Sequence, residues 1–310
     1  MEFTHIPVLL KECIDGLNIK PDGIYLDGTL GLGGDSLEIV KRLDKGRLIA
    51  IDRDSNALLY AGERLKEYAN KITFVHDDFK NAEYHLNRLG IDKLDGVLLD
   101  LGVSSYQIDD ASRGFSYRFD SPLDMRMDQT QYLTAFNVVN EYSESDLLRI
   151  FYKYGEERFS KNVAQNIIRA RNENSIRTTG ELAKIVTASI PMKYRYEGGN
   201  PCKKIFQAIR IEVNEELTGL YEGILSLVGR LRTGGRCCII AFHSLEDRTA
   251  KQDFKSLERD CVCEKRMPIC TCGKKREVNI LTKKPITASD EELKTNGRAE
   301  SAKLRIAEKL

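Results

Sequence analysis

Acidic side chains end three short apolar runs in the first hundred residues. Asp27, Asp52 and Asp100 each follow a run that reads as a buried strand. In an open parallel sheet, ligands bind beyond the carboxyl ends of the strands, and these ends share one edge. We therefore expect the three carboxylates to gather there and to favour a ligand that carries positive charge or hydroxyl donors.

A glycine-rich turn, residues 28–34, follows Asp27 and lets a ligand approach the backbone closely. It lacks the G-x-G-x-x-G spacing with which dinucleotide enzymes hold a pyrophosphate. S-adenosylmethionine (SAM) has no phosphate, and its sulfonium and amino-acid groups suit acidic strand ends. Asp52 follows Asp27 by roughly 25 residues, near the offset of a ribose-binding acid. The pattern favours a nucleoside ligand, with an ordinary strand-to-helix turn as the alternative. Phe79 either flanks an adenine ring or belongs to the core.

The first third of the chain alternates between strand and helix patterns, which is typical of a parallel sheet covered on both faces. Strands are predicted at residues 23–27, 47–52, 72–75 and 96–99, with helices at 36–43 and 55–68.

A charged, helix-patterned segment follows, and a strand pattern returns only at residues 236–242. We predict an α/β domain formed by residues 1–112 and 211–310, interrupted by an all-helical insert at 113–210. The cysteine-rich and then basic tail is expected to end in a helix at 301–307.

The 8 cysteines are not expected to form disulfides. Cys237 and Cys238 lie in a strand and read as core. Two C-x-C pairs, Cys261 with Cys263 and Cys270 with Cys272, read either as reduced thiols in a loop, which we take as the default, or as a tetrahedral zinc site. No histidine pair has metal-ligand spacing, so no metal is expected at the catalytic site.

The composition is that of a globular protein, with 31% charged residues and a formal net charge of +1. Such balance argues against non-specific coating of nucleic acid but not against local basic patches. We find no apolar run near the ~20 residues of a bilayer span and no signal-peptide pattern at the start. The expected location is therefore the cytoplasm, without membrane association.

Ordered motifs along nearly the whole chain resemble the RsmH (MraW) family, the 16S ribosomal RNA cytosine N4-methyltransferases. They lie at residues 5–12, 27–34, 99–105, 113–116, 122–128, 154–160, 206–208, 213–217, 242–248 and 301–305.

The resemblance implies an α/β class I SAM-dependent methyltransferase fold, Rossmann-like with a mostly parallel sheet, and an all-helical inserted domain that recognises RNA. It implies SAM as cofactor, 16S rRNA of the small ribosomal subunit as partner, and a decoding-region (P-site) cytidine as target. The SAM-binding positions carried over are Gly33, Gly34, Asp35, Asp52, Phe79, Asp100 and Gln107. Asp35 departs from the family, which usually has His there.

The acceptor, an exocyclic cytosine amine, is a poor nucleophile and benefits from groups that accept its hydrogens. We expect Asp100 and the turn with Ser104 and Ser105 to orient this amine, or Asp100 to hold only SAM. His243, with Asp247, either lines the cytidine pocket or caps a helix.

Basic runs in the insert and tail are candidate RNA contacts, with a solvated surface as the alternative for each. They are 193–196, 203–204, 274–276, 283–284 and Arg298.

Three other functions stay open: a SAM methyltransferase with another acceptor such as DNA, a dinucleotide oxidoreductase, and a non-catalytic ribosome-assembly factor. The sequence does not give the oligomeric state, and a homodimer is among the assemblies left open.

Overall fold

The computed structural model describes residues 7–195, 199–263 and 270–310. The chain divides into two compact units, one formed by Met1–Gly102 with Leu217–Leu310 and the other by Val103–Glu216. The second unit therefore starts at residue 103 and ends at 216, whereas the sequence pattern suggested 113–210. His5 and Ile6 of the first motif, and Tyr196 of a basic run, lie outside the described residues.

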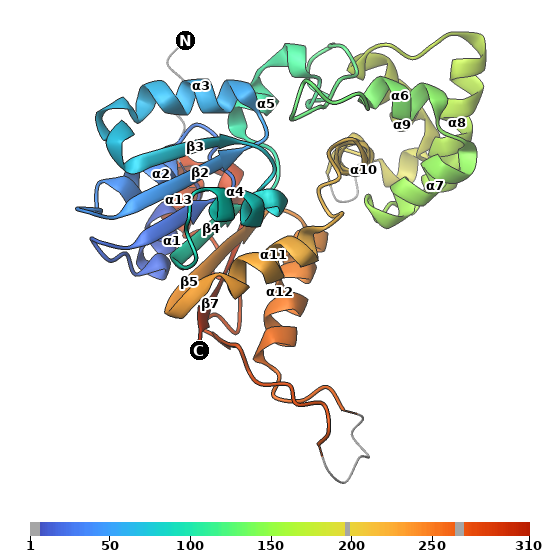
Figure 1. Ribbon diagram of the computed structural model, residues 1–310. Coiled ribbons are helices and arrows are strands. Elements are labelled where there is room, and N and C mark those ends of the chain that lie inside the picture. Colours follow the sequence, from blue (N-terminus) through green and yellow to red (C-terminus); the bar gives the residue numbers. More distant parts are fainter. Residues whose placement is uncertain (1–6, 196–198, 264–269) are drawn as a thin grey trace. The chain divides into compact units, whose positions relative to one another are not determined.

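A seven-stranded sheet forms the centre of the first unit, in the order β3-β2-β1-β4-β5-β7-β6 (Figure 1). Its strands are β1 Ile24–Asp27, β2 Arg47–Asp52, β3 Ile72–His76, β4 Leu94–Asp100, β5 Leu231–Ala241, β6 Val278–Ile280 and β7 Lys303–Lys309. The strands from β1 to β5 pair in parallel, and β7 pairs antiparallel with β5 and β6. This mostly parallel sheet confirms the fold class that the resemblance implied.

Alternate side chains of the strands pack into two apolar clusters, one on each face, as expected for a sheet covered on both faces. In β2, Leu48 and Ala50 join one cluster, while Ile49 and Ile51 join the other. Cys237 and Cys238 of β5 divide in the same way and are fully buried, which confirms them as core residues.

Helices cover both faces of this sheet. The first cluster takes residues from α1 Leu10–Leu17, α2 Gly34–Val40 and α3 Ser55–Arg64, with α13 Asp290–Thr295 packed against it. The second takes residues from α4 Ala82–Arg88, α11 Leu220–Gly229 and α12 Ser244–Glu258. Short 3₁₀ turns lie at Lys66–Lys71, Phe79–Asn81 and Gly297–Ser301.

The tail contradicts the predicted helix at residues 301–307, because 303–309 form strand β7. Leu304 and Ile306 enter one apolar cluster and Ala307 the other, which is a period of two. The charge between them is buried as well: Arg305 Nε donates to Asp247 Oδ1 at 2.7 Å. This distant partner allows an arginine to sit within a covered strand.

The described part of the second unit is built from helices. They are α5 Ser105–Asp109, α6 Ala135–Glu141, α7 Glu144–Lys153, α8 Ser160–Glu173, α9 Thr179–Ser189 and α10 Cys202–Asn214, with 3₁₀ turns at Ala111–Arg113 and Met192–Tyr194. Thr134, Ser143 and Thr178 accept backbone N–H groups at the starts of α6, α7 and α9.

Within the described ranges, no helix combines the length and the apolar character needed to cross a membrane.

Candidate functional site

The glycine-rich turn between β1 and α2 is fixed to the neighbouring strands by its backbone. The Gly28 N–H donates to Leu98 O of β4 at 2.9 Å, and the Leu30 N–H donates to Ile51 O of β2 at 3.0 Å. Gly31 and Gly33 have φ of +50° and +73°, a region that favours glycine. A turn bound on both sides offers a rigid floor at the carboxyl ends of the strands.

Two of the predicted carboxylates have protein partners. Asp27 accepts Ser36 Oγ–H at 2.6 Å and the Thr29 N–H at 3.1 Å. Asp52 accepts the Gly31 N–H at 2.7 Å and the Asp54 N–H at 2.8 Å. Burial raises the pKa of each to about 6 in spite of these bonds. Asp27, with both oxygens engaged, holds the start of α2 to β1, a structural role that the sequence did not distinguish from ligand binding.

The other two carboxyls, Asp35 and Asp100, each keep a buried oxygen without a hydrogen-bond partner: Oδ1 in both cases. Burial, and then repulsion from Asp27, raises the pKa of Asp35 to about 7. Burial, and then repulsion from Asp35 and Asp27, raises the pKa of Asp100 well above its usual value. Asp100 itself is held in place because its N–H donates to Thr29 Oγ1 at 2.6 Å, a contact that no local pattern predicts.

Buried polar atoms are nearly always hydrogen-bonded, so unpartnered carboxylate oxygens indicate where a ligand's positive or donor groups belong. The sulfonium and ammonium of SAM supply positive charge, and its ribose supplies two hydroxyl donors for an acid such as Asp52. These residues therefore fit SAM.

The remaining predicted SAM residues of the first unit lie on the turn and after β3. Gly33 is the residue before α2, and Gly34 and Asp35 begin that helix. Phe79 begins the 3₁₀ turn Phe79–Asn81 and packs, half-buried, against the apolar cluster under α11. Part of this ring therefore belongs to the core, while its contact with adenine stays a prediction.

His243 is the N-cap residue of α12, and its Nδ1 accepts the Glu246 N–H at 3.3 Å. Accepting at Nδ1 leaves the proton on Nε2, which lies 3.1 Å from Glu246 Oε1. The same Glu246 accepts the Phe242 N–H at 2.9 Å and is itself buried. Nε2 lies close to this carboxylate but is buried without a hydrogen-bond partner, so only Nδ1 is engaged by the first turn of α12. Asp247 forms ion pairs with Arg305 and Lys303 of β7.

Ser104, Ser105 and Gln107 belong to the helical unit, at the start of α5. Ser104 Oγ accepts the Gln107 N–H at 3.3 Å, and Gln107 Oε1 accepts the Ser104 N–H at 3.0 Å. This reciprocal capping box buries Gln107 and fixes the turn, with Ser105 as the first helical residue.

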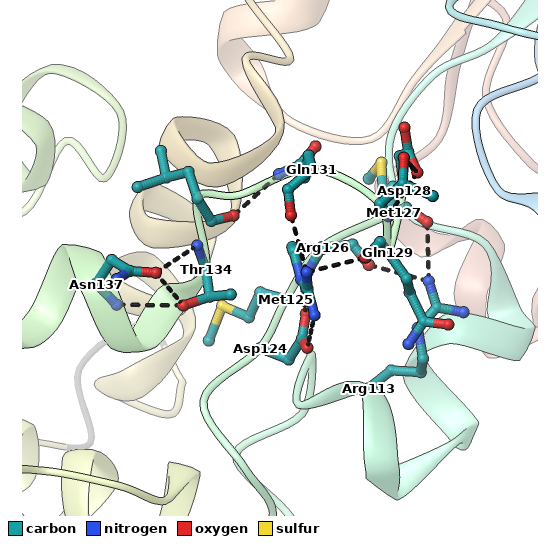
Figure 2. A network of polar contacts seen from close by, with 12 residues as sticks. Arg113, Asp124, Met125, Arg126, Met127, Asp128, Gln129, Gln131, Thr134 and Asn137 are labelled. Carbon is teal, nitrogen blue, oxygen red and sulfur yellow. Dashed lines mark hydrogen bonds and ion pairs between the residues drawn. The ribbon is translucent and has the colours of Figure 1, made fainter.

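The motif at 122–128 forms a tightly bonded loop in the helical unit (Figure 2). Arg126 binds both oxygens of Asp124, at 2.9 and 2.8 Å, and donates from Nη1 to two backbone carbonyls of the same loop. The buried Arg113 donates to the carbonyls of Arg126 and Met127, both at 2.9 Å. The guanidinium groups bind carbonyls and a carboxylate of this loop, which gives Arg113, Asp124 and Arg126 a structural role.

Asn214 at the end of α10 fixes this loop from the other side. Its Oδ1 accepts the Met127 N–H and its Nδ2 donates to Met125 O, both at 2.7 Å. Met125 has φ of +60°, so its carbonyl is turned toward Asn214 by an uncommon backbone conformation.

A basic and aromatic cluster lies on the surface of the helical unit. The Arg158 guanidinium lies over the rings of Phe159 and Tyr194, at 5.5 and 5.0 Å from their centroids, and Lys193 Nζ lies 5.5 Å from that of Tyr194. Arg158 and Lys193 are exposed. The sequence predicted Lys193 and Tyr194 as candidate RNA contacts. The structure adds Arg158, which is 35 residues earlier than Lys193 in the chain, to the same cluster.

The profile of the MraW methylase family matches residues 2–310. Three relatives named Ribosomal RNA small subunit methyltransferase H align with 100% of this chain. They come from Clostridium botulinum strain Loch Maree (55% identical, 100% of its length), Lachnospira eligens (54%, 99%) and Clostridioides difficile (52%, 100%). The full-length match and the high identity show that this chain belongs to the MraW methylase family.

Proposed function

We propose that this chain transfers a methyl group from SAM to the exocyclic N4 amine of a decoding-region cytidine in 16S rRNA of the small ribosomal subunit. The proposed reaction is supported mainly by two buried carboxylate oxygens without hydrogen-bond partners, Oδ1 of Asp35 and Oδ1 of Asp100. The substrate rests on relatives whose names describe small-subunit rRNA methyltransferases and which match the chain from end to end.

SAM is held, in this proposal, by the turn and strand ends of the first unit. Gly33, Gly34 and Asp35 lie beside its methionine part, Asp52 accepts its ribose hydroxyls, and Phe79 flanks the adenine. Asp52 is oriented for this task by the N–H groups of Gly31 and Asp54. Gln107 adds a contact from the turn that follows Asp100 in the sequence.

Bound SAM supplies an electrophilic methyl group on a sulfonium. The cytidine nitrogen forms the new N–CH₃ bond while the S–CH₃ bond breaks, the sulfonium becomes a neutral thioether, and the nitrogen loses one proton. Asp100 accepts a hydrogen of the amine before transfer, which favours a more tetrahedral nitrogen. Its raised pKa suits it to receive the proton afterwards.

Ser104 and Ser105 present the turn that orients the amine, because the capping box with Gln107 fixes their backbone. His243 acts as a positioning residue: its Nδ1 caps α12, and its Nε2 lies 3.1 Å from Glu246 Oε1.

The helical unit supplies RNA recognition in this proposal. Exposed guanidinium and ammonium groups stacked on aromatic rings, as at Arg158, Lys193 and Tyr194, match what unstacked bases and phosphates require. A target base must leave its stack before a methyltransferase can reach it. We place the activity in the cytoplasm, where small subunits are available.

The test compares Asp100→Asn with Asp253→Asn. Asp253 on α12 is the matched control, because it is also buried with one unpartnered carboxylate oxygen, Oδ2. Asp100→Asn is expected to lower the rate of methyl transfer to unmethylated small subunits by about 100-fold, which is the loss typical of removing one transition-state contact. Asp253→Asn should transfer methyl groups at a rate near that of the wild type.

Equilibrium binding of SAM separates the two roles of Asp100. Weaker binding in Asp100→Asn would assign it to the cofactor, and unchanged binding with slow transfer would assign it to the amine. A variant that keeps both affinity and turnover would contradict the proposal.

A further inference from the structure

The cysteines of the tail form a cluster that the methyl-transfer site does not use. Cys261, Cys263, Cys270 and Cys272 lie in the segment between α12 and β6, and their Sγ atoms all lie within 4.8 Å of one another. The other four cysteines of the chain are buried singly or in the sheet. We propose that this cluster is a structural zinc site with four thiolate ligands.

The sulfur-to-sulfur distances match a single tetrahedral metal ion. Sγ of Cys270 lies 3.5 Å from that of Cys261, 3.6 Å from that of Cys272 and 3.9 Å from that of Cys263, and Cys261 and Cys272 are 3.7 Å apart. Zn–S bonds of about 2.3 Å in a tetrahedron separate the sulfurs by about 3.8 Å. A disulfide would bring two of them to about 2.05 Å, so the arrangement is that of ligands around a common centre.

Backbone groups also point at these sulfurs. The Val262 N–H donates to Cys272 Sγ at 3.4 Å, and the Cys263 N–H donates to Cys261 Sγ at 3.3 Å. A neutral thiol is a weak acceptor, whereas a metal-bound thiolate carries negative charge and gains from such donors. Each C-x-C pair thus contributes one sulfur that is already oriented by the backbone.

The described part of this segment lacks an apolar core. Among its described residues, 259–263 and 270–277, none is buried, so an apolar core cannot order it. Its base is anchored: the Glu277 N–H donates to Leu257 O at 2.9 Å, and Arg276 pairs with Glu258 at 3.0 Å. In Figure 1 the chain runs away from the sheet after α12 and returns toward β6, a projection that a metal would tie together.

Charge balance supports the same assignment. Four thiols that bind Zn²⁺ release four protons and leave a net charge of −2 on the site. Lys274, Lys275 and Arg276 lie two to four residues after the last ligand and bring positive charge near it, although Lys274 and Arg276 also pair with Glu277 and Glu258. Tetrahedral sulfur ligation suits zinc or iron, and zinc needs no redox partner.

The experiment is metal analysis of the full chain, purified without chelators, by mass spectrometry of the elements. We expect about one zinc per chain in the wild type. Cys261→Ser and Cys272→Ser should each lose at least about nine-tenths of it, while Cys202→Ser, which removes a buried thiol of α10 outside the cluster, should keep it.

A second measurement keeps the test independent of how well the variants fold. Wild-type protein stripped of metal and titrated with Co²⁺ should show the strong thiolate-to-cobalt absorption of a tetrahedral S₄ site, saturating at one equivalent. Iron in place of zinc, metal content unchanged in Cys261→Ser, or wild type that neither retains zinc nor gives this cobalt spectrum would overturn the assignment.

Discussion

The substitution Asp35→Asn tests the electrostatic reasoning behind the SAM site. Burial and the neighbouring Asp27 raise the pKa of Asp35 to about 7, from a usual value near 4. The folded chain therefore binds this proton more tightly than the unfolded chain does. Stability from this group is fully present below pH ~4 and is lost as the pH rises through 7.

The magnitude follows from that difference. A rise of about 3 in the pKa lowers the free energy of unfolding by about 4 kcal/mol at pH 8, where Asp35 is ionised in both states. At pH 5, where it is ionised only in the unfolded chain, the loss is about 1.5 kcal/mol. Asparagine removes the charge at both pH values. The variant should therefore gain about 2–3 kcal/mol more in the free energy of unfolding at pH 8 than at pH 5.

The assay is urea unfolding at the two pH values, without and with saturating SAM. Asp253→Asn is the control, since burial and then Glu222 raise the pKa of Asp253 to about 7 as well. Both variants should be stabilised at pH 8 without ligand. Only Asp35→Asn should lose part of the stabilisation by SAM, because only Asp35 faces the ligand in our account. Equal gains at both pH values, or an equal response of the two variants to SAM, would refute the reasoning.

Three further predictions concern the turn, the cofactor and the helical unit. Gly33→Ala should lower the melting temperature more than Gly31→Ala: both residues have positive φ, but a Cβ on Gly33 would lie 3.1 Å from Leu65 Cδ1, whereas at Gly31 the nearest atom, Thr29 O, would be 4.0 Å away. Isothermal titration should show SAM binding weakened at least about tenfold between pH 8 and pH 5, because Asp52, with a pKa of about 6, and Asp35, with a pKa of about 7, are mostly protonated at the lower pH and must lose that proton to bind as carboxylates; affinity independent of pH would argue against charged acceptors. Asn214→Ala should lower the free energy of unfolding by about 2–4 kcal/mol in urea titrations, since it leaves a buried N–H and a buried C=O unpaired; a loss below ~0.5 kcal/mol would count against the bonded loop of Figure 2.

Much of the sheet could be predicted because each of these strands is a local run of apolar residues. Three apolar runs that end in Asp27, Asp52 and Asp100, with a fourth at residues 72–75, are sufficient to predict the parallel strands β1 to β4 and the edge at which a ligand is expected. The strand β7 could not, because Arg305 is buried only by virtue of Asp247, 58 residues earlier in the chain. A local pattern that contains a charge says nothing about such a partner.

Residue types predicted which residues form the candidate site, but not which role each of them has. Asp27 and Asp100 both end strands, yet Asp27 is satisfied by Ser36 and Thr29, while Asp100 keeps an unpartnered oxygen. His243 illustrates the same limit: a histidine after a strand suits catalysis or capping, and only the Glu246 N–H shows that it caps α12.

The most direct test of the account is methyl transfer from labelled SAM to small ribosomal subunits that lack this modification, followed by digestion of the 16S rRNA to nucleosides. We expect label in N4-methylcytidine at one methyl per subunit, with little label after Asp100→Asn. Label in another nucleoside, or none from a protein that binds SAM, would contradict it.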